Sequence, residues 1–136
     1  MLHPTLRIDL DSPTPVYRQI ADALRTVLVA GGIKSGENLP TIRELALDLG
    51  IHKNTVAEAD RVLADEGWLQ LRRRHGARVL TRVVPDGGEQ AVERFSRRLR
   101  EVLAEALAAG VGVDDAERAL ETSLQELKNG LEESEG

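Results

Sequence analysis

The sequence predicts a mainly α-helical protein with one small two-stranded β hairpin, and three observations lead to this class. Apolar residues recur at helical spacing in five separate stretches of the chain. Two short segments with strand character flank a single run of basic residues. Glycines stand at the ends of most helical stretches, where they stop a helix. The 136 residues suffice for one compact domain with an appended element.

The N-terminal part of the chain predicts a short strand followed by a helix. Residues 5–10 alternate between polar and apolar side chains, as a half-buried strand does. Thr14 can cap the following helix, and Pro15 suits its first position because no N–H partner is needed there. The helix ends at the glycine pair 31–32, and a loop is expected over residues 33–38.

Two short helices separated by a tight turn are predicted in the middle of the chain. Thr41 and Glu44 have the spacing of a capping box at the start of the first helix. Gly50 supplies a turn because glycine adopts positive φ without strain. The second helix runs from about His52 to Glu66, and its predicted buried positions are Val56, Ala59, Val62 and Leu63.

A basic hairpin is predicted after these helices, with strands over residues 68–71 and 77–80 and the run Arg72–Gly76 at its tip. The net charge of the chain is −5, but residues 1–84 hold 12 Lys and Arg against 10 Asp and Glu. The acidic excess therefore lies in residues 85–136, with 6 basic against 13 acidic side chains. A charge run is also typical of an ordinary solvated surface, so its position in the fold must decide its meaning.

Three small or apolar residues before this basic hairpin have the spacing of a helix-turn-helix. Such a motif needs a small residue where the helices cross, a turn residue tolerant of positive φ, and an apolar anchor on the second helix. Ala46, Gly50 and Val56 stand at those offsets. The second helix of the motif enters the major groove of DNA, which is about 12 Å wide. Residues 39–80 are thus predicted to form a winged helix-turn-helix that binds duplex DNA.

The C-terminal part predicts a linker over residues 83–88 and two amphipathic helices. The first helix spans about residues 89–109, and Asp114 or Asp115 caps the second. Their apolar stripes exceed what one small helical pair can hide, so they are expected to pair with a second chain. Packing on the first domain of the same chain is the alternative. The predicted dimer-interface residues are Phe95, Leu99, Val102, Leu103, Leu120, Leu124 and Leu127.

The predicted organisation has three parts. Residues 1–82 form a winged helix-turn-helix DNA-binding domain, residues 83–131 form a helical dimerisation element, and residues 132–136 form a disordered acidic tail. The fold class is therefore mainly α with a small β wing, in which a winged helix-turn-helix precedes two C-terminal helices.

Composition argues against several other classes of protein. The chain has no cysteine, which excludes disulfides, thiolate zinc sites and thiol catalysis. None of the three histidines lies in a recognisable catalytic or metal-binding motif. We therefore expect no enzyme activity, no metal and no cofactor. No apolar stretch is long enough for a membrane span and no signal peptide is visible, so a cytoplasmic location is expected.

Four segments of the sequence resemble the DNA-binding domain of the GntR family of bacterial transcription regulators. They are the run Pro15–Ile20, the run Leu39–Ala46, the triplet Asn54–Val56 and the run Glu66–Leu69. Their order and spacing cover about residues 14–80. The short two-helix extension resembles the small YtrA-type subfamily, because larger subfamilies carry an effector-binding domain for which these residues leave no room.

The resemblance implies DNA contacts at matching positions. Arg43 corresponds to an arginine that contacts a guanine edge, although a surface arginine paired with a nearby acid is the alternative. His52, Lys53, Asn54 and Thr55 lie at the recognition-helix start, where capping and solubility alone would also explain them. The implied DNA-binding residues are Thr41, Arg43, His52, Lys53, Asn54, Thr55, Arg72, Arg74, His75 and Gly76.

The expected function is that of a dimeric transcription regulator, most simply a repressor that binds a near-palindromic double-stranded DNA operator. The sequence identifies neither the operator nor a small-molecule effector. Two alternatives stay open: a helical protein-interaction module in which the basic hairpin is incidental, and a remnant of a fusion between a regulator and an aminotransferase-like domain. Salt-dependent DNA binding distinguishes a transcription regulator from the interaction module, and a longer reading frame would support the fusion remnant.

Overall fold

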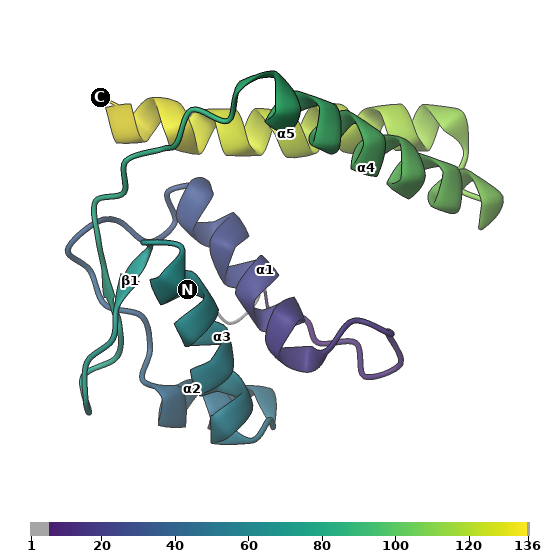
Figure 1. Cartoon of the computed structure of the whole chain (residues 1–136). Coiled ribbons are helices and arrows are strands. Elements are labelled where there is room, and N and C mark those ends of the chain that lie inside the picture. The colour runs from purple at the N-terminus through teal and green to yellow at the C-terminus, as the bar shows by residue number, and fades with distance from the viewer. Residues whose placement is uncertain (1–5, 136) are drawn as a thin grey trace. The chain divides into compact units, whose positions relative to one another are not determined.

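The computed structural model describes the backbone of residues 6–135 and the side chains of residues 6–130. Its elements in chain order are α1 (Val16–Val29), α2 (Ile42–Leu49), α3 (Lys53–Asp65), β1 (Leu69–Gln70), β2 (Arg78–Val79), α4 (Gly88–Ala108) and α5 (Val113–Glu135) (Figure 1). The predicted class, mainly α with a small β wing, is confirmed. Contacts between residues divide the chain into two units. The first comprises the residues up to Arg82 together with the segment from Asn129 onward, and the second comprises Val83–Lys128.

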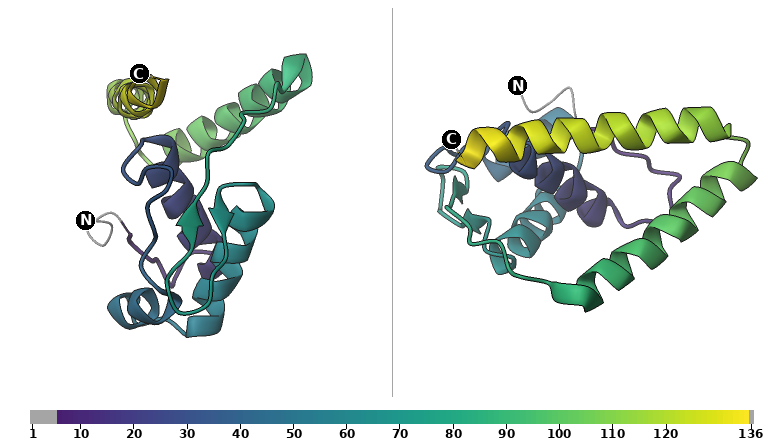
Figure 2. Two further views of the ribbon diagram at one scale, coloured as in Figure 1. Left: turned by 90° about the vertical axis from the view of Figure 1, so that its left-hand side faces the viewer. Right: turned by 90° about the horizontal axis from the view of Figure 1, so that it is seen from above.

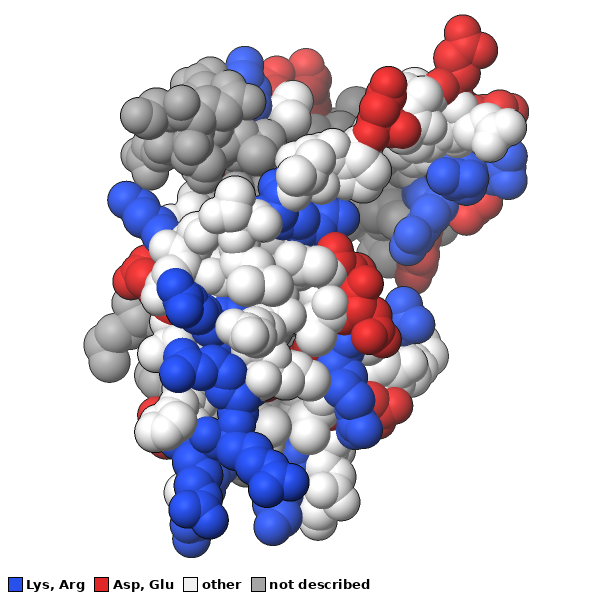
Figure 3. All heavy atoms as spheres, turned by 60° about the vertical axis from the view of Figure 1, so that its left-hand side comes forward, with Lys and Arg blue, Asp and Glu red and all other residues white. Residues whose placement is uncertain are grey.

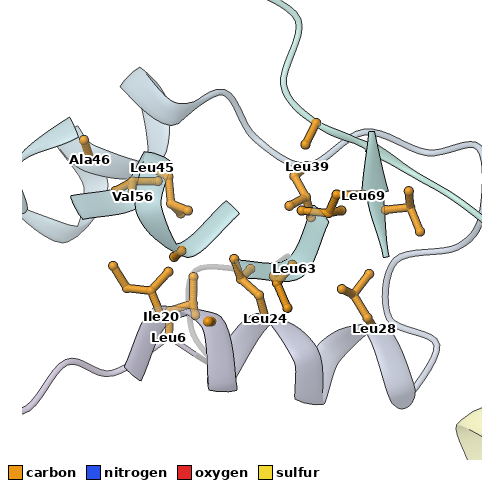
Figure 4. Close-up of a cluster of buried hydrophobic side chains, with 14 residues drawn as sticks. Leu6, Ile20, Leu24, Leu28, Leu39, Leu45, Ala46, Val56, Leu63 and Leu69 are labelled. Atoms are coloured by element: carbon orange, nitrogen blue, oxygen red, sulfur yellow. The ribbon is translucent and has the colours of Figure 1, made fainter. Parts of the chain in front are cut away.

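A single apolar core holds the first unit together. Helix α3 packs against both α1 and α2, and β1 lies against α3. Figure 4 shows side chains from these elements pointing toward one another. Ile20, Leu24, Leu45, Val56 and Leu63 are the largest fully buried ones. The core therefore fixes the positions of α2, α3 and the first wing strand relative to one another.

The turn between α2 and α3 has the geometry that the sequence predicts for a helix-turn-helix. The Thr41 hydroxyl accepts a hydrogen bond from the Glu44 N–H (3.1 Å), which caps α2. Gly50 ends α2 with a φ of 66°, and the Ile51 N–H donates to the Ala46 carbonyl (3.0 Å). The predicted pair of Ala46 and Val56 is buried on either side of this turn.

The wing is a hairpin whose second strand is bonded on both edges. Strands β1 and β2 pair antiparallel, with Leu69 opposite Val79 (Figure 2). On its other edge, β2 contacts the segment before α2: the Val79 N–H donates to the Glu37 carbonyl and the Leu39 N–H donates to the Ala77 carbonyl, both at 2.8 Å. The wing is thereby held against the start of the helix-turn-helix.

The expectation of a strand over residues 5–10 is wrong for the described residues 6–10, which have no strand partner. The Gln19 side chain bonds both backbone groups of Asp9 (2.9 Å each), which replaces a strand ladder. Leu6 is buried whereas Leu10 is 76 % exposed. The alternating pattern therefore reflects contacts of Leu6 and the half-buried Ile8 with the core rather than a pleated strand.

Two further expectations about helix ends are corrected. Thr14 does not cap α1, because Pro15 is the residue before the helix and no side chain caps it. Residues 132–135 are the last turn of α5 rather than a disordered tail, and Gly136 lies outside the described residues. Glutamate is a good helix former, so an acidic run that follows a helical stripe continues the helix.

The second unit contains α4 and the part of α5 up to Lys128. Helix α4 has no buried residue. Figure 2 shows that the two helices meet at the turn over residues 109–112 and diverge from it. Within the part of the chain that the structure describes, no helix combines the length and the apolar character required to cross a membrane.

Candidate nucleic-acid interface

A groove with a volume of about 810 Å³ lies between the start of α2, one side of α3 and the wing. Six of its lining residues belong to the predicted DNA-binding set: Thr41, Arg43, Lys53, Arg72, Arg74 and Gly76. The other lining residues are Ile42, Ala57, Asp60, Arg61, Leu71 and Ala77. Three successive elements thus bring much of the predicted set to one face.

The basic side chains of this groove are exposed and available for an anionic partner. Arg43, Lys53, Arg72 and Arg74 are all exposed, and none of them takes part in an ion pair with another described residue. Figure 3 shows Lys and Arg side chains gathered at one end of the first unit. Cations left unpaired by the protein can neutralise phosphates, which release their own counterions in exchange.

His52, Asn54 and Thr55 do not line the groove but lie at the first turn of α3, beside Lys53. His52 caps this helix, because its Nδ1 accepts a hydrogen bond from the Asn54 N–H (3.1 Å). Nδ1 accepts only when the ring proton is on Nε2. The free N–H groups and the dipole of a helix N-terminus favour an anion at this end.

The tip of the wing contains two residues with positive φ, Arg74 at 68° and Gly76 at 70°. Gly76 is buried, and a Cβ at this position would lie 2.1 Å from the Leu39 carbonyl oxygen. A glycine is therefore required for the hairpin to lie on the segment before α2. Arg74 has no such contact and adopts a conformation that costs an L-residue roughly 1–2 kcal/mol. His75 is exposed between them.

Sequence reasoning missed Asp60, which lines the groove from α3 and is only 3 % exposed. Its Oδ1 has no hydrogen-bond partner among the described residues. Burial raises the pKa of this carboxyl group to about 6. The available signal was positional, because residue 60 shares the helical face of the buried residues 56, 59 and 63.

A network of polar contacts fixes the base of the wing to α1 and α3. The Arg25 guanidinium forms a bidentate ion pair with Glu66 (2.8 and 2.5 Å), which lowers the pKa of Glu66 below its ordinary value. Arg82 donates to the Glu66 carbonyl (2.8 Å), and its guanidinium lies 4.7 Å from the centre of the Trp68 ring. The half-buried Trp68 thus closes the wing onto the helices.

The predicted dimer-interface residues lie on α4 and α5 and are only partly covered. Phe95, Val102, Leu120 and Leu124 are 41–63 % exposed. Leu99, Leu103 and Leu127 are half-buried. Among the described residues, no group of three or more His, Asp or Glu side chains is arranged to hold a metal ion.

Comparison with known proteins agrees with this arrangement. Residues 16–79 match the gntR family of bacterial regulatory proteins. The chain is 27 % identical over 125 residues to the HTH-type transcriptional repressor YtrA of Bacillus subtilis, an alignment that covers 92 % of this chain and 96 % of that protein.

Two solved structures are also similar. YtrA from Sulfolobus acidocaldarius, a GntR-family transcription factor, is 36 % identical, with a TM-score of 0.55 over 76 % of this chain and 98 % of that one. A crystal structure of AraR(DBD) in complex with operator ORX1 shares the fold at 24 % identity and a TM-score of 0.50, over 54 % of this chain and 95 % of that one. The helix-turn-helix and the basic wing agree with these likenesses. The chain therefore belongs to the GntR family of bacterial transcriptional regulators: it contains the family's DNA-binding domain and is similar to YtrA.

Proposed function

We propose that this regulator represses transcription as a homodimer that binds a near-palindromic operator in duplex DNA. The observation that carries the proposal is the convergence on one groove of basic side chains from α2, α3 and the wing that form no ion pair with a described residue. Two similar proteins support this proposal: the Bacillus subtilis relative is named as a repressor, and the AraR domain is bound to an operator.

In this proposal each element has its own part in DNA recognition. Helix α3 enters the major groove with the first turn, Lys53–Thr55, leading, and Arg43 at the start of α2 contacts a guanine edge. A bidentate contact of this kind discriminates between bases by roughly 1–3 kcal/mol. Thr41 and the wing residues Arg72, Arg74 and His75 contact the sugar-phosphate backbone, which positions the protein without reading sequence.

The dimer is supported by the exposed apolar stripes of α4 and α5, with Phe95 at 63 % and Leu124 at 62 % exposure. Two copies that cover these stripes form a two-fold pair, because identical patches then face each other. A two-fold dimer binds two half-sites in opposite orientation. The palindromic operator therefore follows from the dimer.

Selection of bound sequences from a random duplex library tests the operator. We expect two inverted copies of one half-site at a fixed separation. Enrichment of a single unrepeated site would contradict the two-fold arrangement, and absence of any enrichment would contradict sequence-specific binding. If the protein instead acts as a helical interaction module, it will retain no duplex DNA even at low salt.

A further inference from the structure

The acid Asp60 lies in the part of the first unit where DNA is proposed to bind. It lines the groove from α3. Two residues at the start of α2, two others of α3 and two of the wing line the same groove: Thr41, Arg43, Lys53, Arg61, Arg72 and Arg74. Its side chain is almost fully buried, and its Oδ1 has no partner among the described residues. A buried carboxylate without a partner is costly, so its presence in this groove needs an explanation.

Asp60 is buried, whereas the basic side chains of the same lining are exposed and form the rim of the groove: Arg43, Lys53, Arg61, Arg72 and Arg74. Desolvation by burial raises the pKa of the Asp60 carboxyl group to about 6. In the free protein at neutral pH, the carboxyl group is mostly ionised.

DNA that binds along this groove changes the surroundings of Asp60 in two ways. It excludes water, which disfavours the charged form of a carboxyl group. It also brings phosphates close, and like charges disfavour ionisation further, while the rim arginines are attracted toward the phosphates. Both effects favour the protonated acid in the complex.

We propose that Asp60 is part of the DNA-binding surface and that it takes up a proton when duplex DNA occupies the groove. This inference rests on the proposed DNA-binding function. Its consequence is that DNA affinity falls as the pH rises above 6, by at most tenfold per pH unit for one linked proton. Asp60 then makes operator binding sensitive to pH near neutrality.

The test is the affinity for a fluorescent duplex, chosen from the random library by the wild-type protein, measured between about pH 5.5 and about pH 8 at constant ionic strength. The wild type should bind several-fold more weakly at the upper end. Asp60→Asn should bind more tightly than the wild type at about pH 8 and approach it at about pH 5.5. The matched control is Asp65→Asn, which removes an exposed acid from the same helix and should keep the wild-type slope.

The exposed histidines require their own control, since histidine changes charge between pH 5 and 8. His52 and His75 are retained in Asp60→Asn, so a slope caused by them would persist in that variant. Calorimetry of DNA binding by the wild type and by Asp60→Asn, in buffers of different ionisation heat, measures the proton uptake of each protein while both histidines are retained. We expect the wild type to take up more protons than Asp60→Asn.

The outcomes separate the two proposals. DNA binding with an equal pH slope in the wild type and Asp60→Asn, or equal proton uptake by these two proteins, overturns the role of Asp60 alone. A wild type that binds no duplex at any pH overturns the proposed function as well.

Discussion

The groove contains two kinds of basic side chain that are expected to behave differently. Arg43 projects from the start of α2, next to the first turn of α3, whereas Arg72 and Arg74 belong to the wing. A base edge is read by a contact of fixed geometry, whereas a phosphate is neutralised at every sequence alike. Substitution of single arginines can therefore separate specificity from affinity.

Arg43→Ala should relax the base preference at one position of each half-site. Arg74→Ala should weaken binding to all sequences by a similar factor and reduce the salt slope by about 1. Site selection followed by affinity measurements on matched and mismatched duplexes distinguishes the two effects. Identical behaviour of the two variants would show that our division between base and phosphate contacts is wrong.

Asp60 also predicts a pH dependence of folding stability. Its folded pKa of about 6 exceeds the ordinary value of 3.8, so the folded state binds more protons between these values. The free energy of unfolding should therefore fall as the pH rises from about 4 to about 6, by up to about 3 kcal/mol. Asp60→Asn removes the ionisable group and should be more stable than the wild type at pH 7, by about 2 kcal/mol, with no such advantage at pH 4.

Urea denaturation at the two pH values measures this difference. The Asn amide is left without a partner as well, which makes the gain smaller than the full ionisation penalty. An equal effect of Asp60→Asn at both pH values would contradict the burial of an ionised carboxylate.

The wing is positioned by contacts that are remote in sequence. Strand β2 bonds to β1 and to residues 36–39, and Gly76 lies directly on the Leu39 carbonyl. Glu66, Arg25 and Arg82 join the wing base to α1 and α3. The wing is thus part of the first unit's fold rather than a free hairpin.

Gly76→Ala should destabilise the first unit by more than about 2 kcal/mol, because the new Cβ would overlap the Leu39 carbonyl oxygen at 2.1 Å. The matched variant is Gly50→Ala, which has nearly the same positive φ, 66° against 70°, but nothing within 4 Å of the added Cβ. It should lose only about 1 kcal/mol of backbone strain. Equal losses in thermal unfolding of the two variants would mean that the wing does not press on the segment before α2.

These elements also show what the sequence could predict and what it could not. The helix-turn-helix was predictable because Thr41, Ala46, Gly50 and Val56 act within a few residues of one another. The bonds between β2 and residues 36–39 join segments about 40 positions apart, and no local pattern signals them. Residues 6–10 look like a strand by alternation but have no partner, since the Gln19 side chain takes that place.

Most of the candidate site was predicted from the sequence, but one of its residues was not. Arg43 was predicted from the family resemblance and the wing arginines from their charge and position, and the fold brings them to one groove. Asp60 was overlooked because an acid in a helix is usually taken as surface. Only its position on the face of Val56 and Leu63 reveals its burial.

Dimerisation is the property of the whole protein on which the palindromic operator depends. Phe95→Glu, on the exposed stripe of α4, should yield a monomer in sedimentation at micromolar concentration and weaken operator binding, because the two half-sites are then bound independently. Ala104→Glu adds the same charge to an exposed position on the other side of α4 and should stay dimeric. A monomeric wild type would rule out the dimer.

The salt dependence of duplex DNA binding by the wild-type protein tests most directly whether the basic groove is a DNA-binding surface. We expect tight binding at low salt and an affinity that falls steeply as salt rises, with log K linear in log salt and a slope of about −0.9 per phosphate contact. Absence of binding at low salt, or binding that is indifferent to salt, would contradict the proposal that this groove binds DNA.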